Sequence, residues 1–159
     1  MATYHFKTEQ FIPIGIDEAW DFFSSAKNLA LITPPEMDFK ILTELDDREI
    51  FEGMIIDYTV RPLFGIPLKW QTEIIKVKKP WSFTDRQVKG PYKVWEHTHI
   101  YIRQNNGIIM QDEVKYELPL GLVGKIANAL VVRKKIEDIF TFRKNVLTKM
   151  YGTDEHILS

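Results

Sequence analysis

Two histidines separated by one residue are the feature of the sequence with the clearest chemical potential. His97 and His99 stand in the run Trp95-Glu96-His97-Thr98-His99, whose alternation of residue types is typical of a strand. Alternate side chains of a strand lie on one face, so the two imidazoles would lie about 7 Å apart on the same side. Imidazoles titrate near neutral pH and bind metals, so this pair could transfer protons or hold an ion.

Neighbouring predicted strands bring carboxyl and amide groups to the same face. Alternation groups Asp85 with Gln87 in the segment 82–89, and it places Asp112 among apolar residues in the segment 108–117. The opposite faces of these segments carry more charge, so we expect the first faces to point inward. The candidates for an inward-facing ligand pocket are Trp70, Phe83, Asp85, Gln87, Trp95, His97, His99, Tyr101, Asp112 and Tyr116.

Three interpretations of this polar group remain open at the level of sequence. The side chains would form an internal hydrogen-bond network that fixes strand register, or they would orient the polar end of an apolar ligand. In the third interpretation they carry chemistry. His97 and His99 would bind Zn²⁺ or Fe²⁺ with one of the two aspartates, or His97 with Asp112 would act as an acid–base pair. Because two-histidine spacings are common, we expect no metal and no cofactor.

The elements that would hold these residues follow from hydrophobic periodicity and turn signals. Strands are predicted over 3–12, 39–44, 50–60, 68–78, 82–89, 93–103 and 108–117. Two short helices are predicted, one over 18–24 with Asp17 as its N-cap and one from 25 or 26 to 31, and a long helix over 124–151. Short turns such as Asn106-Gly107 join the strands, which indicates an antiparallel meander.

This order keeps strands and helices separate, which indicates an α+β fold. The first part of the long helix, 126–132, is apolar nearly all round, so we expect it to be covered on several sides. We therefore predict a helix-grip architecture, in which a curved antiparallel sheet of about seven strands wraps around the long C-terminal helix. A cavity between this helix and the sheet would be the place where a small ligand binds.

Three motifs give the sequence a resemblance to a known family. They read DRQVKGPY at 85–92, WEHTH at 95–99 and YELPLG at 116–121. Together with the order of elements, they resemble the START-like superfamily, also called SRPBCC, which includes polyketide cyclases and dehydrases. They are most similar to a bacterial ligand-binding branch, found alone or joined to a nucleotide-sugar epimerase-like domain and sometimes labelled cell division inhibitor. The resemblance implies a helix-grip fold with a pocket between helix and sheet, and it implies no particular catalytic residues.

Composition and missing motifs narrow the class of protein. The 159 residues include no cysteine, which excludes disulfide scaffolds, thiolate metal sites and cysteine nucleophiles. The 21 basic and 22 acidic residues nearly balance, so we expect no nucleic acid as a partner. We see no signal peptide and no apolar run of the ~20 residues that cross a bilayer, so we expect a cytoplasmic location without stable membrane association. Residues 1–159 would form a single domain.

Two apolar loops are a separate indication of function. They cover the segments 63–67 and 118–123. Because loops that face water are usually polar, these would form the mouth of the pocket, with Phe64, Leu120 and Leu122 at its rim. Alternatively they would pack against each other or in a dimer contact, and the sequence leaves the oligomeric state open.

These observations favour a protein that binds a small hydrophobic or aromatic molecule, such as a lipid or a polyketide-like metabolite. Trp70, Trp95 and Tyr101 would supply apolar contacts. One alternative is a cofactor-free cyclase or dehydratase that uses histidine and aspartate side chains of the pocket as acid and base. The other is a protein-interaction module that docks through the apolar loops.

Overall fold

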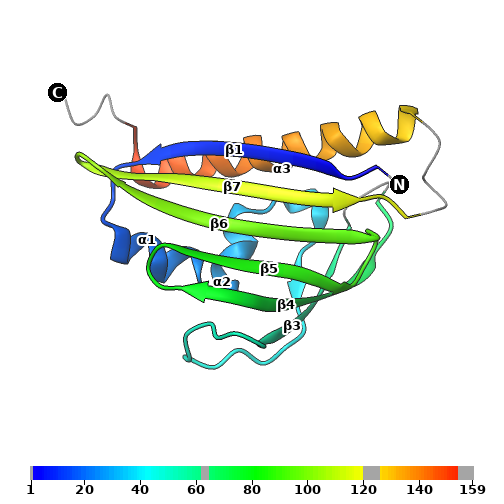
Figure 1. Ribbon diagram of the computed structural model, residues 1–159, viewed down its shortest axis with the longest axis horizontal. Coiled ribbons are helices and arrows are strands. Elements are labelled where there is room, and N and C mark those ends of the chain that lie inside the picture. Colours follow the sequence, from blue (N-terminus) through cyan, green and yellow to red (C-terminus); the bar gives the residue numbers. More distant parts are fainter. Residues whose placement is uncertain (1, 62–64, 120–125, 154–159) are drawn as a thin grey trace.

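One antiparallel sheet of seven strands forms the body of the structure, and the last helix lies along it beside β1 (Figure 1). The computed structural model describes residues 2–61, 65–119 and 126–153, and in the last helix it describes side chains from Ala129 onward. The elements are, in chain order, β1 (Tyr4–Ile12), α1 (Ile16–Phe23), α2 (Ala26–Leu29), the 3-10 turns η1 (Ala30–Ile32) and η2 (Pro35–Met37), β2 (Lys40–Ile41), β3 (Ile55–Val60), β4 (Leu68–Lys78), β5 (Ser82–Lys89), β6 (Val94–Gln104), β7 (Gly107–Glu117) and α3 (Ile126–Tyr151).

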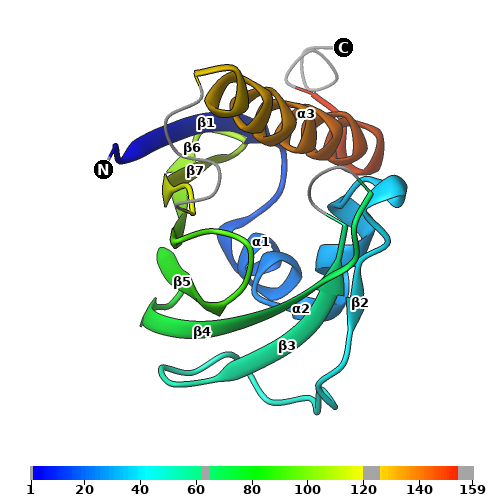
Figure 2. The same cartoon turned by 90° about the vertical axis from the view of Figure 1, so that its right-hand side faces the viewer.

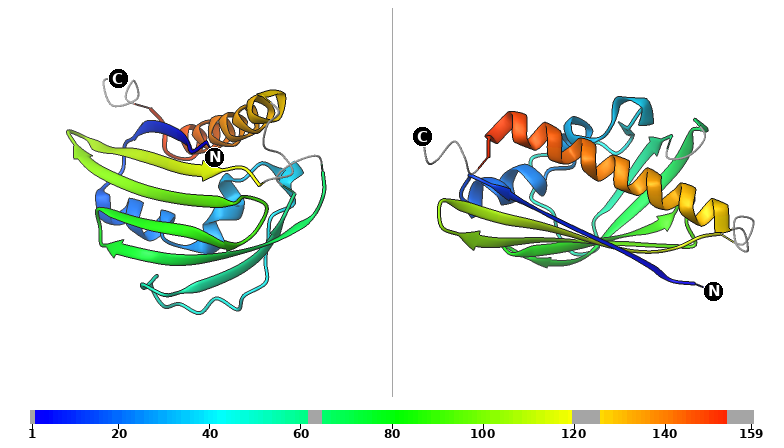
Figure 3. Two further views of the ribbon diagram at one scale, coloured as in Figure 1. Left: turned by 45° about the vertical axis from the view of Figure 1, so that its right-hand side comes forward. Right: turned by 90° about the horizontal axis from the view of Figure 1, so that it is seen from above.

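The sheet is strongly curved, which creates the space that the candidate site occupies. Its strands lie in the order β1-β7-β6-β5-β4-β3-β2, so consecutive strands from β2 to β7 are neighbours, as the meander prediction requires. The pairing of β4 with β5 shifts register after Gln71 and again between Ile74 and Lys76, and such irregularities bend a sheet. Figure 2 shows the sheet curving from β1, beside α3, round to β3 and β2, with α1 and α2 on its concave side. In Figure 3, α3 runs along most of the length of the sheet.

Five of the seven predicted strands agree with the structure to within one residue at each end. The other two are shorter than predicted, because 39–44 forms only β2 and 50–60 forms only β3. A turn explains the second difference. Gly53 has a φ of 92°, a left-handed conformation that favours glycine, and its N–H donates to the carbonyl of Ile74 at 2.7 Å. The chain therefore reaches the sheet through a turn and not through an extended strand.

The first helix begins earlier than predicted. It starts at Ile16 with Gly15 as the N-cap residue, so the prediction of Asp17 as N-cap is wrong. Asp17 and Glu18 lie instead in the first turn, where carboxylates interact favourably with the positive end of the helix. The predicted second helix is divided into α2 and η1. Within the described residues, no helix has the length and apolarity needed to cross a membrane.

Among the side chains that the structure describes, α3 buries one stripe and exposes others. Val132, Ile136 and Phe140 are buried and are spaced by four residues, which places them on one stripe of the helix. By contrast, 66% of Leu130 and 39% of Val131 are exposed. The expectation that this apolar part of the helix is covered on several sides is therefore wrong for these two residues, which lie off the buried stripe.

Candidate functional site

The two histidines and two aspartates lie together on the concave face of the sheet, on three adjacent strands. Asp85 on β5 is directly opposite His97 on β6, and Asp112 on β7 is directly opposite His99. Directly opposed residues of an antiparallel pair share a face, so all four side chains lie on one side, as the alternation predicted.

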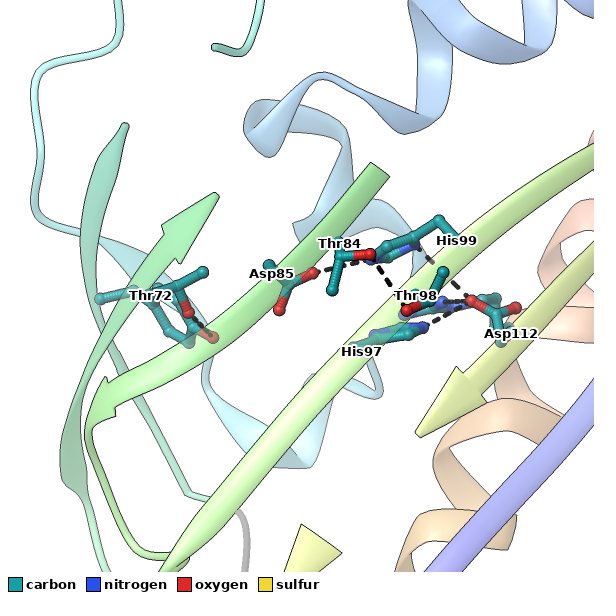
Figure 4. Close-up of polar contacts among 9 residues, drawn as sticks. Thr72, Thr84, Asp85, His97, Thr98, His99 and Asp112 are labelled. Atoms are coloured by element: carbon teal, nitrogen blue, oxygen red, sulfur yellow. Dashed lines mark hydrogen bonds and ion pairs between the residues drawn. The ribbon is translucent and has the colours of Figure 1, made fainter. Parts of the chain in front are cut away.

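Each histidine is hydrogen-bonded to the aspartate that is diagonal to it. His97 Nε2 lies 2.7 Å from Asp112 Oδ1, and His99 Nε2 lies 2.8 Å from Asp85 Oδ2. Figure 4 shows the two rings side by side on β6, with Asp85 on one side and Asp112 on the other. Because an ionised carboxylate only accepts hydrogen bonds, each Nε2 carries the proton and donates it.

A column of stacked rings fixes the orientation of both imidazoles. The ring of His99 stacks on Phe83, with centroids 4.0 Å apart and planes 12° apart. On its other side it stacks on His97 at 3.8 Å, and His97 in turn meets the edge of Phe140 on α3 at 5.7 Å. Side chains held by both stacking and hydrogen bonds lose rotational freedom, so the histidines are preorganised.

A buried arginine from α3 completes the cluster and was not among the residues predicted from the sequence. Arg143 Nη1 lies 3.4 Å from Asp112 Oδ1, and both side chains are buried, with 6% and 1% of their surface exposed. His99 Nδ1 lies 3.7 Å from the same oxygen. Asp112 is therefore surrounded by one cation and two imidazoles.

The surroundings of Asp112 keep its carboxylate ionised. Burial acts to raise the pKa of Asp112, but the hydrogen bond from His97 and the charge of Arg143 outweigh it, so the pKa lies at about 2. The opposite holds for His99. Burial and then the neighbouring His97 lower the pKa of His99, so its ring is neutral at pH 7.

A cavity of about 130 Å³ opens between α3, the segment from α2 to β2 and the concave face of the sheet. The polar groups of the cluster differ in their access to it. Exposed fractions of the side chains are 16% for Asp85, 13% for His99, 8% for His97 and 1% for Asp112. The cavity is lined by Leu29, Thr33, Met37, Phe39, Tyr58, Val60, Trp70, Asp85, Tyr92, Trp95, His97, His99, Ile136, Ile139, Phe140 and Arg143.

A second cavity of about 80 Å³ adjoins the first one. Phe83 forms part of its wall, and the residues that it shares with the larger cavity are Leu29, Phe39, Tyr58, Asp85 and His99. Its walls are predominantly apolar, and Asp85 and His99 line both cavities. A larger recess of about 220 Å³ beside α1 has a more polar wall without histidine, so it offers less chemistry.

The structure brings six of the ten predicted pocket residues to these cavities. Asp85 and His99 line both cavities, while Trp70, Trp95 and His97 line the larger one and Phe83 the smaller one. Asp112 lies behind the histidines and does not reach the open space. The three residues predicted at the mouth, Phe64, Leu120 and Leu122, lie outside the described residues.

The remaining three predicted residues have structural surroundings. The amide of Gln87 donates to the carbonyl of Tyr92 at 2.7 Å and accepts from its N–H at 3.0 Å, which braces the turn between β5 and β6. Tyr101 is 1% exposed and stacks on Phe23 at 5.7 Å in the core around α1. Tyr116 is also 1% exposed, and its ring packs among other aromatic rings of the core.

Several residues of the cavity wall were not predicted from the sequence, although the sequence pattern points to two of them. Arg143 falls on the apolar stripe of α3, seven residues after Ile136 and three after Phe140, where a charged residue needs a buried partner. Tyr58 lies opposite Trp70 in the pairing of β3 with β4, so alternation from Trp70 points to it. Met37 ends the short 3-10 turn η2 and Phe39 lies just before β2, and elements this short give no periodic signal.

The arrangement suits hydrogen bonding and proton transfer better than metal binding. The ligand atoms of Asp85, His97 and His99 lie within 4.8 Å of one another. Metal–ligand bonds of about 2.0–2.2 Å require the three atoms to converge on one point, and parallel stacked imidazoles direct their lone pairs side by side. These rings would have to turn before they could share an ion.

Similar proteins were found by comparison of structures and not by comparison of sequences. No family model and no curated relative matches the sequence. A solved START superfamily protein from Mycobacterium smegmatis has a TM-score of 0.67 and is 12% identical over 93% of this chain and 98% of that chain. The di-domain ARO/CYC StfQ of the steffimycin biosynthetic pathway has a TM-score of 0.69 and is 10% identical over 99% of this chain and 53% of that chain.

A third similar structure contains the fold as part of a longer chain. The nucleoside-diphosphate sugar epimerase from Corynebacterium glutamicum is 20% identical with a TM-score of 0.62, and the match covers 91% of this chain and 28% of the epimerase chain. At identities this low, the similarity shows a common fold alone. The chain therefore has the α+β helix-grip fold of START-like, polyketide cyclase-like proteins.

Proposed function

We propose that the chain, as one domain over 1–159, binds a compact apolar molecule in the cavity between α3 and the sheet. The composition of the wall carries the proposal. Aromatic rings from β3, β4, β6 and the turn before β6 surround the space, and Asp85 and His99 are its most accessible charged or imidazole groups. An apolar pocket with a few convergent polar groups is typical of small-molecule binding sites.

The size of the cavity limits the ligand to one or two rings. An apolar protein cavity of about 150 Å³ holds a benzene molecule, so the 130 Å³ cavity accommodates about one ring. The adjoining 80 Å³ adds room for a second small group. Drug-sized ligands occupy pockets of about 300–1,000 Å³. The volume thus favours a compact compound over a lipid chain or a multi-ring polyketide, for which the cavity would have to expand.

The alternatives derived from the sequence stay predictions. A cyclase or dehydratase would use His99 as the accessible base, oriented by Asp85. The interaction module would depend on the apolar loops at 63–67 and 118–123, and most of their residues lie outside the described part of the chain. The cavity wall gives ligand binding the more direct support.

Filling the cavity from α3 tests this function. Ile139 lines the cavity, so Ile139→Trp adds about one indole ring in place of the ligand. Leu130→Trp makes a comparable change on the same helix at a side chain that is 66% exposed. With benzyl alcohol as probe, followed through its own NMR signals, we expect Ile139→Trp to weaken binding at least tenfold and Leu130→Trp to leave it unchanged. Equal affinity in both variants would contradict binding in this cavity.

A further inference from the structure

The charges around the cavity do not cancel. Among the described residues of the cluster, Asp85 and Asp112 are the acidic groups and Arg143 is the basic group. Arg143 pairs with Asp112, so Asp85 has no cationic partner among them. The hydrogen-bond partner of Asp85 is the imidazole of His99.

The two histidines together add at most one positive charge to the cluster. Their rings are stacked with centroids 3.8 Å apart, and two imidazolium ions at that distance would repel each other strongly. Burial and the nearby His97 also lower the pKa of His99, the histidine that contacts Asp85. The cluster is therefore negative or neutral, and an anionic ligand would add unbalanced negative charge to a low-dielectric space.

Asp85 is also the most accessible charged group of the cluster. Its side chain is 16% exposed, more than any other member of the cluster. His99 donates to its Oδ2, and within the described chain its Oδ1 has no hydrogen-bond partner. Arg143 Nε, Asp112 Oδ2 and Trp70 Nε1 also lack partners there, but these atoms are fully buried and an occupant cannot reach them without rearrangement.

The aromatic wall beside Asp85 favours positive charge as well. Tyr58 and Trp70 stack with centroids 5.9 Å apart, and Trp95 meets Trp70 edge-on at 5.5 Å. The faces of such rings carry negative electrostatic potential and attract cations, most strongly in sites removed from water. Carboxylate and ring faces therefore favour the same kind of ligand.

We propose that the ligand is a compact amine in its protonated form, whose ammonium group binds Asp85 Oδ1 while its apolar part fills the aromatic cavity. This inference rests on the proposed function, because it names the class of molecule that the cavity takes. A primary ammonium supplies both the hydrogen-bond donor and the charge that Asp85 lacks.

Three probes of similar shape and different charge test the inference. They are benzylamine, benzyl alcohol and benzoate, titrated at pH 7.5 and low ionic strength and followed by NMR. We expect protonated benzylamine to bind at least tenfold more tightly than benzyl alcohol, and benzoate to bind most weakly. Alcohol or benzoate affinity equal to that of the amine would overturn the inference and leave the proposed function intact. No binding by any of the three would overturn both.

Two isosteric variants locate the effect. Asp85→Asn removes the charge but keeps an oxygen that accepts from His99, so we expect the amine to lose its advantage over the alcohol. Asp57→Asn is the matched control, because Asp57 lies in the same sheet on β3, accepts from Gln71 at 3.0 Å and does not line the cavity. An amine preference that survives Asp85→Asn would overturn the inference. Stoichiometric Zn²⁺ binding that Asp85→Asn abolishes would do so too, because it would make Asp85 a metal ligand.

Discussion

Replacing Arg143 by methionine tests whether a buried ion pair organises the wall of the cavity. Arg143 and Asp112 are 6% and 1% exposed, and Nη1 of the first lies 3.4 Å from Oδ1 of the second. Methionine keeps much of the apolar length of the side chain but leaves the buried carboxylate without a cation. Breaking a buried pair in this way costs about 3–5 kcal/mol. We expect about 3 kcal/mol, the lower end, because His97 still donates to the same oxygen.

The pH dependence of stability gives a second measure of the same pair. The pKa of Asp112 in the folded chain is about 2, below its ordinary value of 3.8. A carboxyl group with a depressed folded-state pKa stabilises the fold fully above its unfolded pKa, and this contribution is lost as the pH falls from about 4 to about 2. The shift corresponds to about 2 kcal/mol at neutral pH. Because Arg143 causes part of it, the unfolding free energy of the variant should fall less across this window.

Urea denaturation followed by circular dichroism between pH 2.5 and 7 measures both effects. The comparison includes the double variant Arg143→Met with Asp112→Asn, which removes both charges. We expect the double variant to be more stable than the single variant, since no unpaired buried charge is left. A loss below about 1 kcal/mol in Arg143→Met, or a double variant no more stable than the single one, would refute the reasoning.

Three further changes have defined outcomes. Burial lowers the pKa of His99, so its neutral ring stabilises the fold above pH ~6.5 and less at lower pH. His99→Gln should therefore reduce the change in the free energy of unfolding between pH 7 and pH 5, and an unchanged pH dependence would count against this. Gln87→Leu removes both hydrogen bonds to the Tyr92 backbone and should cost about 1–3 kcal/mol in urea denaturation; a smaller loss would mean that the turn does not need this brace. Trp20→Ala should cost about 3–5 kcal/mol in thermal unfolding because Trp20 is 1% exposed, whereas Trp81, 46% exposed, should tolerate the same change; similar losses would contradict the assigned core.

The shared face of the histidines and aspartates was the part of the site that the sequence pattern predicted well. Alternation along 82–89, 93–103 and 108–117 placed the histidines and aspartates on one face. The structure adds the register, in which Asp85 lies opposite His97 and Asp112 lies opposite His99. The period of a strand is two residues, so a few well-patterned residues determine which face is buried. The helix-grip architecture followed from the same patterns and from the order of elements.

Side-chain partners could not be predicted in the same way. Gln87 lies on the predicted face, but the turn after it brings the Tyr92 backbone within reach of its amide. Arg143 is 31 residues from Asp112 in sequence, and only the packing of α3 on the sheet brings the two together. Met37 and Phe39 lie at the end of η2 and just before the two-residue strand β2, where no longer element fixes their direction. Periodicity reports the face of an element and carries no information about contacts between elements.

The four tryptophans offer the most direct test of the claim that a compact ligand binds between α3 and the sheet. Trp70 and Trp95 line the cavity, whereas Trp20 and Trp81 do not. We would record the indole N–H signals in ¹H–¹⁵N NMR spectra during a titration with benzyl alcohol, which is neutral and so does not depend on the amine inference. The account predicts saturable shifts of the Trp70 and Trp95 signals with those of Trp20 and Trp81 unchanged. Shifts confined to Trp20 or Trp81, or no saturable shift at all, would contradict it.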